Sequence, residues 1–148
     1  MASTARAHPN IALVKYWGKA DDELIIPVAG SMSMTLDKFA TTTTVELTTG
    51  LDSFELNGSR GDTKATGRTT VFLDVVRRLA ADAGLETATA SAKVTSVNEG
   101  PTAAGMASSA SGFAALAVAA ADAYGLKLST KELSRLARRG SGSASRSV

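Results

Sequence analysis

The segment of small residues at positions 100–112 constrains the fold of this chain more than any other feature. It contains the string Gly-Pro-Thr-Ala-Ala-Gly-Met-Ala-Ser-Ser-Ala-Ser-Gly and runs directly into an apolar helical pattern at 113–121. Small side chains let backbone N–H groups approach an anion, and a helix N-terminus adds partial positive charge. The hydroxyls of Ser108, Ser109 and Ser111 would add donors. The pattern predicts a phosphate-binding loop, although small residues here would equally allow tight helix packing.

Two common nucleotide-binding motifs do not occur in the sequence. The Walker spacing Gly-x4-Gly-Lys-Ser/Thr is absent, and so is Gly-x-Gly-x-x-Gly. The class of nucleotide site must therefore be inferred from other segments.

The composition is that of one globular domain, and it excludes several kinds of site. The 148 residues are 44% hydrophobic and 20% charged. The absence of cysteine excludes disulfides, thiolate metal sites and cysteine nucleophiles, and the single His8 argues against a Ser-His-Asp triad or a multi-histidine metal site. The longest apolar run, 113–121, is well short of the roughly 20 residues that span a bilayer. With no apolar signal core at the N-terminus, these features predict a cytoplasmic protein without a membrane partner.

The charge distribution indicates a local anionic ligand rather than a nucleic acid. The net charge is only +2, and the basic residues are concentrated late in the chain, at Arg135, Arg138, Arg139 and Arg146. No nucleic-acid partner is expected.

The first third of the chain is predicted to be mostly β-structure. The apolar run 11–14 indicates a buried strand, and further strands are expected at 24–27, 31–36, 41–49 and 54–56. Asn57-Gly58 is a turn signal after the last of them.

Helical periodicity begins after Gly67, with an expected Asp74–Arg78 pair on the outer face and Gly84 as the stop. Residues 87–94 alternate as a strand does, and they precede the small-residue segment and its helix. A capping box, Ser129-x-x-Glu132, then opens a short helix that ends at Gly140. This order predicts an α+β fold in which helices pack on one face of a mixed sheet.

Two segments leave alternatives open. By composition, Gly140-Ser-Gly-Ser-Ala-Ser145 is typical of a flexible linker. It nevertheless follows a capped helix bearing arginines, so a second oxyanion site is the alternative. Lys15 and Lys19 flank Trp17, and they are either surface lysines around a packing aromatic or ammonium groups directed at an anion.

Three motifs in order carry a resemblance to a known family. They are Asn-Ile-Ala-Leu-Val-Lys-Tyr-Trp-Gly-Lys at 10–19, Pro-Thr-Ala-Ala-Gly-Met-Ala-Ser-Ser-Ala at 101–110 and Gly-Ser-Gly-Ser-Ala-Ser-Arg-Ser at 140–147. Together they resemble diphosphomevalonate decarboxylases of the GHMP kinase superfamily. The resemblance implies the GHMP-kinase N-terminal fold, which is like domain 2 of ribosomal protein S5, and it implies a homodimer.

The reaction implied by the resemblance is the ATP-dependent decarboxylation of mevalonate 5-diphosphate to isopentenyl diphosphate, with Mg²⁺ bridging the ATP phosphates. In the family pattern the substrate diphosphate is bound by Tyr16, Trp17, Gly18, Lys19, Ser141, Gly142, Ser143, Ala144, Ser145 and Arg146. The ATP phosphates are bound by Pro101, Ala104, Gly105, Ala107, Ser108 and Ser109.

The resemblance also implies roles for individual charged residues. Arg146 would hold the substrate carboxylate in a bidentate fork, with Asn10 orienting it, and Lys15 would lie near the transferring phosphoryl group. Arg68 matches another anion-binding arginine of the family, although by itself it is typical of a solvated residue near a helix start. No residue of this chain is assigned as a metal ligand.

The chain departs from the family pattern in length. Family chains continue well beyond this point, so residues 1–148 are expected to be a truncated N-terminal ATP- and substrate-binding domain that lacks the C-terminal domain and the catalytic aspartate. We therefore expect the isolated chain to be inactive and to fold poorly.

Two other functions remain in competition. One is a related kinase that phosphorylates mevalonate or a phosphorylated mevalonate without loss of carbon dioxide, because small pocket changes alter substrate choice. The other is a noncatalytic module such as a nucleic-acid binder, against which the sparse aromatic residues count.

Overall fold

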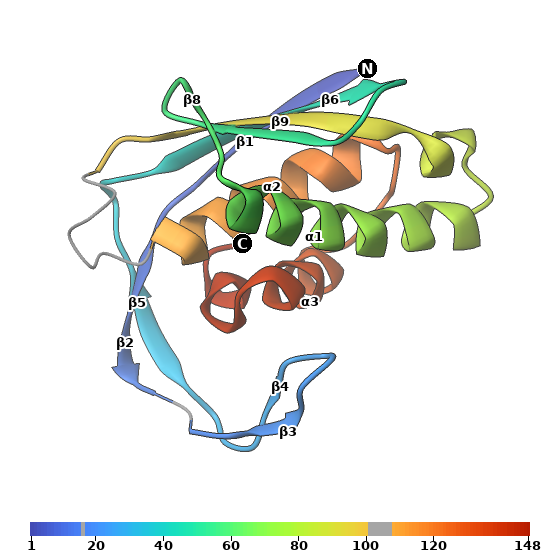
Figure 1. Ribbon diagram of the computed structural model, residues 1–148. Coiled ribbons are helices and arrows are strands. Elements are labelled where there is room, and N and C mark those ends of the chain that lie inside the picture. Colours follow the sequence, from blue (N-terminus) through green and yellow to red (C-terminus); the bar gives the residue numbers. More distant parts are fainter. Residues whose placement is uncertain (16, 101–107) are drawn as a thin grey trace.

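A computed structural model describes residues 1–15, 17–100 and 108–148 of the chain, and its centre is a five-stranded mixed sheet (Figure 1). The strand order is β1 (Ala2–Ala7), β6 (Thr41–Thr48), β9 (Ser91–Asn98), β7 (Ser53–Leu56), β8 (Ser59–Arg60). The β9–β7 pair is parallel, whereas the other three pairs are antiparallel. The β1 strand, which sequence periodicity did not reveal, completes one edge by pairing with β6.

Three helices cover one face of this sheet. Figure 1 shows α1 (Thr63–Asp82) and α2 (Ser108–Ala123) beneath the sheet and α3 (Thr130–Gly140) beneath these two. Two short 3-10 helices complete the order, η1 (Glu86–Thr89) before β9 and η2 (Gly142–Arg146) after α3. The predicted α+β class, with helices on one face of a mixed sheet, is confirmed.

The core lies between the sheet and the two upper helices. The side chains of Thr41, Thr43 and Val45 alternate inward along β6, as the period of a strand requires. The helix α2 lies against β1 and β6, and most of its contact surface is alanine, so the helix packs close to the strands. The helix α1 contributes larger buried side chains to the same core: Phe72, Leu73, Val76 and Ala80.

Two small ribbons project from the sheet, and they differ most from the sequence-based expectations. The strand β2 (Asn10–Val14) pairs with β5 (Met32–Thr35), and β3 (Lys19–Asp21) pairs with β4 (Ile26–Pro27). The prediction of a buried strand at 11–14 was wrong, because Ile11 is 49% exposed and Leu13 is 60% exposed. An apolar run indicates a strand, but it does not specify what covers that strand.

The start of α1 lies earlier than its periodicity indicated. Asp62 is the N-cap, and its carboxylate accepts a hydrogen bond of 2.7 Å from the backbone N–H of Ala65. The expected Asp74–Arg78 side-chain pair does not form. Asp74 instead pairs with Arg77 at 2.7 Å, while Arg78 donates to the backbone carbonyl of Asp74. An i,i+3 pair on the same face therefore replaces the i,i+4 pair.

The strand predicted at 87–94 begins only at Ser91, because η1 occupies the first part of that range. The Thr87 hydroxyl donates to the backbone carbonyl of Tyr124 at 2.6 Å, which ties this turn to the end of α2. The capping box at Ser129 and Glu132 is confirmed, with both reciprocal hydrogen bonds present. Gly84 has a φ of +71°, in agreement with its predicted role as a helix stop.

None of the helices in the described ranges has both the length and the apolar character needed to cross a bilayer.

Candidate active site

The main candidate site is a pocket between η2 and the β2–β5 ribbon. The chain leaves α3 at Gly140 and forms η2 next to the first residues of β2. A cavity of about 390 Å³ opens there, and we call it the Arg146 pocket. Its lining comprises Asn10, Ala12, Lys15, Ser141, Gly142, Ser143 and Arg146. The pocket thus joins the first and third sequence motifs, which are more than a hundred residues apart.

The Arg146 guanidinium is oriented by two side chains. Its Nε donates to Oδ1 of Asn10 at 3.3 Å, and one Nη donates to the Ser31 hydroxyl at 2.7 Å. These two bonds direct the planar group while leaving other N–H donors available to a ligand. The backbone carbonyl of Arg146 accepts from the Thr35 hydroxyl, so η2 is attached to β5 as well as to β2.

Asn10 is buried, with 3% of its surface exposed, and it links η2 to the ribbon. Its amide Nδ2 donates to the backbone carbonyl of Ser143 at 2.9 Å and to the hydroxyl of Ser147 at 2.7 Å. With its Oδ1 on Arg146, this one side chain holds three points of the third motif. Buried polar groups with all positions satisfied fix a unique geometry.

The serine-rich segment is an ordered turn, so the flexible-linker interpretation was wrong. Ala144 is fully buried at the centre of η2. The Ser134 hydroxyl of α3 donates to the backbone carbonyl of Ser145 at 2.6 Å, and the Ser145 hydroxyl donates to the carbonyl of Gly142 at 3.0 Å. Small residues are therefore required here for close packing, which composition alone cannot distinguish from flexibility.

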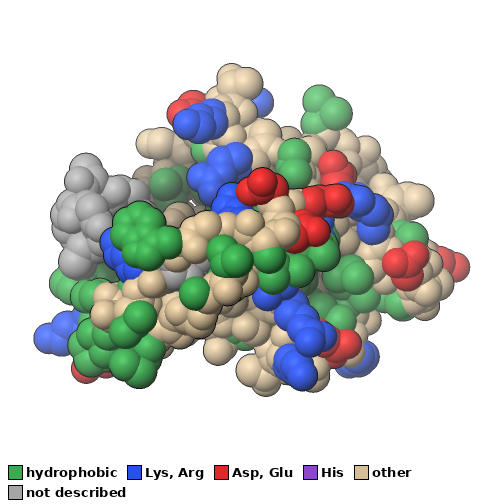
Figure 2. Space-filling view, turned by 90° about the horizontal axis from the view of Figure 1, so that it is seen from below, with side chains coloured by type: hydrophobic (Ala, Val, Ile, Leu, Met, Phe, Trp, Pro, Cys, Tyr) green, Lys and Arg blue, Asp and Glu red, His purple; other side chains and the backbone are tan. Residues whose placement is uncertain are grey.

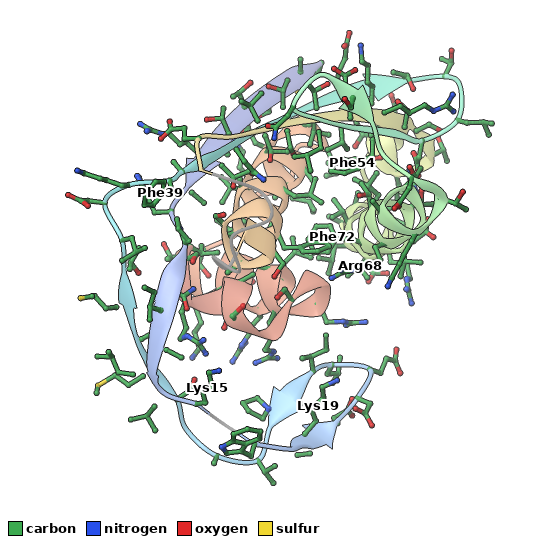
Figure 3. All side chains as sticks on the ribbon, turned by 60° about the vertical axis from the view of Figure 1, so that its left-hand side comes forward. Lys15, Lys19, Phe39, Phe54, Arg68 and Phe72 are labelled. Carbon is green, nitrogen blue, oxygen red and sulfur yellow. The ribbon has the colours of Figure 1, made fainter. Side chains whose placement is uncertain are left out.

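The residues of the first motif are distributed over two places. Lys15 lines the Arg146 pocket, whereas Lys19 lies on the β3–β4 hairpin, where it pairs with Asp22 at 3.4 Å (Figure 3). Trp17 is 82% exposed. Gly18 has a φ of +75°, and a Cβ at this position would lie 2.9 Å from Val28 Cγ2, so the turn between the two ribbons requires glycine. Tyr16 lies outside the described residues.

A second cavity, of about 200 Å³, lies beside the N-terminus of α2, and we call it the α2 cavity. Apolar side chains from β7 and α2 form much of its wall, and polar groups from β6, β9 and the first turn of α2 complete it. Its lining is Thr41, Phe54, Leu56, Ala65, Arg68, Thr69, Ser96, Asn98, Ser109, Gly112, Phe113 and Leu116. Of the predicted phosphate-loop residues, Ser109 is exposed at this cavity, and Ser108 is the first residue of α2. Pro101, Ala104, Gly105 and Ala107 lie outside the described residues.

Arg68 lies at the α2 cavity rather than in the Arg146 pocket. Its Nη2 donates to the carbonyl of Gly140 at 3.2 Å, and its guanidinium carbon lies 5.1 Å from the centre of the Phe113 ring. A cation at this carbonyl complements the C-terminal dipole of α3. Arg68 therefore stands between the end of α3 and the start of α2.

Sequence reasoning missed two contributors to the Arg146 pocket, Ser31 and Ser147. Ser31 directly precedes β5 and holds the guanidinium, and the alternating pattern at 31–36 indicated a strand there but not the partner of this hydroxyl. Ser147 holds Asn10. No local pattern singles it out among so many serines.

A partly buried charge network lies apart from both cavities. Arg77 pairs with Asp52, and its Nε donates to the carbonyl of Ala90, which also accepts from the Tyr124 hydroxyl at 2.7 Å. Burial lowers the pKa of Arg77, but the hydrogen bonds to Asp52 and Asp74 and the nearby charges of Tyr124 and Asp52 together outweigh burial and raise that pKa. Burial raises the pKa of Tyr124. This network stabilises the junction of α1, β9 and the end of α2.

The surface seen from below presents both basic and acidic side chains, with hydrophobic ones exposed among them (Figure 2). The described residues contain no group of three or more acidic or histidine side chains that could hold a metal ion.

The comparisons with known proteins agree with this geometry. Residues 7–148 match the family model for the diphosphomevalonate decarboxylase-like N-terminal domain. The diphosphomevalonate decarboxylase of Homo sapiens is 44% identical over 158 residues, covering 99% of this chain and 39% of the relative. The protein of that name from Ganoderma lucidum is 43% identical, with 99% and 39% covered. The chain therefore spans about two fifths of the length of these curated relatives.

Solved structures give the same result. The crystal structure of mevalonate diphosphate decarboxylase from Staphylococcus aureus superimposes with a TM-score of 0.91 at 50% identity, covering 99% of this chain and 43% of that one. A structure of the Enterococcus faecalis enzyme, described by its mevalonate diphosphate mediated ATP binding mechanism, gives 0.90 at 54% identity, with 99% and 44% covered. A third, described as a complex of MDDEF with MVAPP, AMPPCP and magnesium, gives 0.90 at 54%, with 100% and 44% covered.

Proposed function

The chain belongs to the diphosphomevalonate decarboxylase-like family, and from this premise we propose that residues 1–148 form the N-terminal ATP- and substrate-binding part of an ATP-dependent decarboxylase. The substrate would be mevalonate 5-diphosphate, and the products isopentenyl diphosphate, ADP, phosphate and carbon dioxide. The observation that carries the proposal is the Arg146 pocket, in which an oriented guanidinium and Lys15 line a cavity walled by a serine-rich turn.

The chemistry requires several anions to be held close together. A β-hydroxy acid loses carbon dioxide slowly because hydroxide is a poor leaving group. Phosphorylation of the tertiary 3-hydroxyl by ATP supplies a better leaving group, and the departure of phosphate leaves positive charge at C3. The electrons of the carbon–carbon bond to the carboxylate neutralise that charge as carbon dioxide is released. The substrate carboxylate must therefore be fixed before the phosphate departs.

Arg146 fits the task of fixing that carboxylate. Its remaining N–H donors can hold a carboxylate in a bidentate fork, and Asn10 and Ser31 hold its plane in position beforehand. Lys15 at the same pocket can neutralise a phosphoryl oxygen. The half-buried hydroxyls and backbone of 141–145, together with Gly18 and with Lys19 at the start of β3, are the proposed diphosphate-binding groups. Tyr16 and Trp17 are proposed to complete that subsite on the strength of the family pattern.

The α2 cavity is the proposed place of the nucleotide. The N-terminus of α2 with Ser108 and Ser109 would face the phosphates, along with the remaining loop residues Pro101, Ala104, Gly105 and Ala107. The apolar wall around Phe54 and Leu56 suits a purine base. Arg68 is available to a phosphate at the mouth of this cavity.

Mg²⁺ is proposed as the counter-ion that arrives with the nucleotide. The described residues have no acidic cluster that would hold the ion alone, whereas phosphate oxygens and serine hydroxyls are its preferred oxygen ligands. When bound, the ion would offset the charge of the phosphates. The family resemblance further supports a cytoplasmic homodimer. Light scattering on the purified protein tests the oligomeric state.

The deciding experiment measures ADP and carbon dioxide together, with Mg-ATP and mevalonate 5-diphosphate, in the longest natural polypeptide that contains this segment. Equal yields are expected. ADP without carbon dioxide would instead favour a kinase. The absence of both products would refute the proposal.

Two matched pairs of variants assign the cavities. Arg146→Lys keeps the charge but loses the fork, and it should lower kcat/KM by about a hundredfold, whereas Arg60→Lys on exposed β8 should not. Leu56→Trp should fill the α2 cavity and raise the KM for ATP alone. The control Leu51→Trp changes a side chain that is 91% exposed. Equal effects within either pair would refute that assignment.

A further inference from the structure

Three side chains connect the two strands and the helix that meet beside the α2 cavity. The strand β9 ends at Asn98, which lies opposite Thr41, the first residue of β6. Ser111 lies in the first turn of α2. The Thr41 hydroxyl donates to Asn98 Oδ1 at 2.8 Å and lies 2.8 Å from the Ser111 hydroxyl. We call these three residues the hydroxyl relay.

The direction of the relay follows from its donors. An amide oxygen can only accept, so Thr41 uses its single proton on Asn98. The Thr41 oxygen keeps lone pairs that can accept from the Ser111 hydroxyl. Thr41 and Ser111 are each 1% exposed, and aligned hydrogen bonds in such surroundings reinforce one another.

The Asn98 end of the relay is anchored independently. The backbone N–H of Asn98 donates to Oδ1 of Asn57 at 2.8 Å, and the backbone N–H of Asn57 donates to the carbonyl of Ser96 at 2.9 Å. Asn57 lies in the turn between β7 and β8, with a φ of +51°. The end of β9 is therefore fixed to both neighbouring strands. Thr41 links this fixed strand end to the first turn of α2.

We propose that Thr41 is a positioning residue, which sets the first turn of α2 relative to the end of β9 and thereby the geometry of the α2 cavity. The inference rests on the proposed function, in that this cavity and helix end receive Mg-ATP. Thr41 does not transfer a proton and need not touch the nucleotide. It holds Ser109 and the α2 backbone N–H groups where the phosphates would meet them, and misplacement by about 1 Å is enough to cost up to a hundredfold in rate.

Thr43 is a matched control on the same strand and face. It is fully buried, and its hydroxyl lies 2.8 Å from the hydroxyl of Ser96, its partner in register on β9. Replacing either threonine by valine removes one buried hydroxyl and preserves the shape. Only the change at Thr41 separates Ser111 from Asn98.

The test compares Thr41→Val, Thr41→Ser and Thr43→Val in the longest natural polypeptide that contains the segment. Four quantities are measured: amide hydrogen exchange of 108–112 without ligand, the Kd for Mg-ATP, and the KM and kcat with each substrate. Thr41→Val is expected to speed exchange in the first turn of α2 and to weaken Mg-ATP binding about tenfold or more. The KM for mevalonate 5-diphosphate should stay unchanged, and Thr41→Ser should restore the wild-type values.

Equal exchange and equal Mg-ATP binding in Thr41→Val and Thr43→Val would overturn the inference, because both hydroxyls would then contribute only to the stability of the core. If Thr41→Val does not fold, Ser111→Ala, which removes the hydrogen bond between Thr41 and α2 but keeps the one between Thr41 and Asn98, must show the same faster exchange. Normal exchange there would overturn the inference. A wild-type protein that binds Mg-ATP but releases no carbon dioxide would refute the proposed reaction and leave these comparisons decisive. One that binds no Mg-ATP would overturn both.

Discussion

Replacing Gly140 by alanine should destabilise the protein through a clash with one aromatic ring. A Cβ at this position would lie 1.9 Å from Cδ1 and 2.4 Å from Cγ of Phe113. Carbon atoms pack best at about 3.5–4.0 Å, so the ring must move by roughly 1.5 Å. That ring is held by Phe72, at 5.4 Å between ring centres, and by Arg68 above it.

The magnitude follows from these contacts. Overpacking a well-filled site costs about 1–3 kcal/mol, and disturbing the aromatic pair adds roughly 0.5–1.5 kcal/mol. Against this, alanine gains at most about 1 kcal/mol over glycine in a helix, and less at the last residue of α3. The expected net loss for Gly140→Ala is about 2 kcal/mol of unfolding free energy.

Urea denaturation of the purified protein measures this loss, and Gly67→Ala is the matched control. Gly67 lies inside α1, and apart from its chain neighbours and the adjacent helix backbone no described atom stands within 4 Å of the position its Cβ would take. That change should therefore stabilise the protein by about 0.5–1 kcal/mol. In a double-mutant cycle, the Gly140→Ala loss of unfolding free energy should be smaller in the Phe113→Leu background than in the wild type. If Gly140→Ala stabilises the protein as Gly67→Ala does, the close-approach argument is refuted.

Further predictions concern the charged and capping groups. Arg77→Leu should cost about 3 kcal/mol in urea denaturation because it leaves Asp52 buried without its partner, and Asp52→Asn in the same background should recover part of that loss. Burial raises the pKa of Tyr124, so its contribution is complete below about pH 10, the ordinary pKa of tyrosine, and is lost at higher pH. Tyr124→Phe should flatten this alkaline decline, and an unchanged pH profile would contradict the assignment. Hydrogen bonds from Ser129 lower the pKa of Glu132, so its contribution is present above about pH 4.3 and is lost as the pH falls further. Glu132→Gln should make thermal stability less sensitive to acid in that range, and an equal sensitivity would count against it.

Local sequence patterns were sufficient for most of the elements. The period of α1, the capping box at Ser129 and the glycine stop at Gly84 each depend on residues within one or two turns, so they could be identified without the fold. The α+β class followed from the order of these elements. Local patterns did not predict burial correctly, as at Ile11 and Leu13, because the residues that cover a strand come from elsewhere in the chain.

The candidate site divides in the same way. Arg146 and Asn10 were found from motifs, and the structure brings them together at 3.3 Å across 136 positions of sequence. Ser31 and the residues of the hydroxyl relay could not have been identified from motifs. A serine or threonine in a strand has the same local pattern whether its hydroxyl faces a guanidinium, a helix turn or the core.

The sequence by itself therefore determined the family, the order of helices and strands, and the chemical character of the site, since these depend on residue types and short spacings. Only the tertiary structure decided that the serine-rich turn is ordered, that Arg68 caps α3 beside α2, and that Thr41 links β9 to α2. The reason is physical. Hydrogen-bond partners of buried polar groups are determined by packing between distant segments, and Gly140 is required because a remote side chain, Phe113, lies against it.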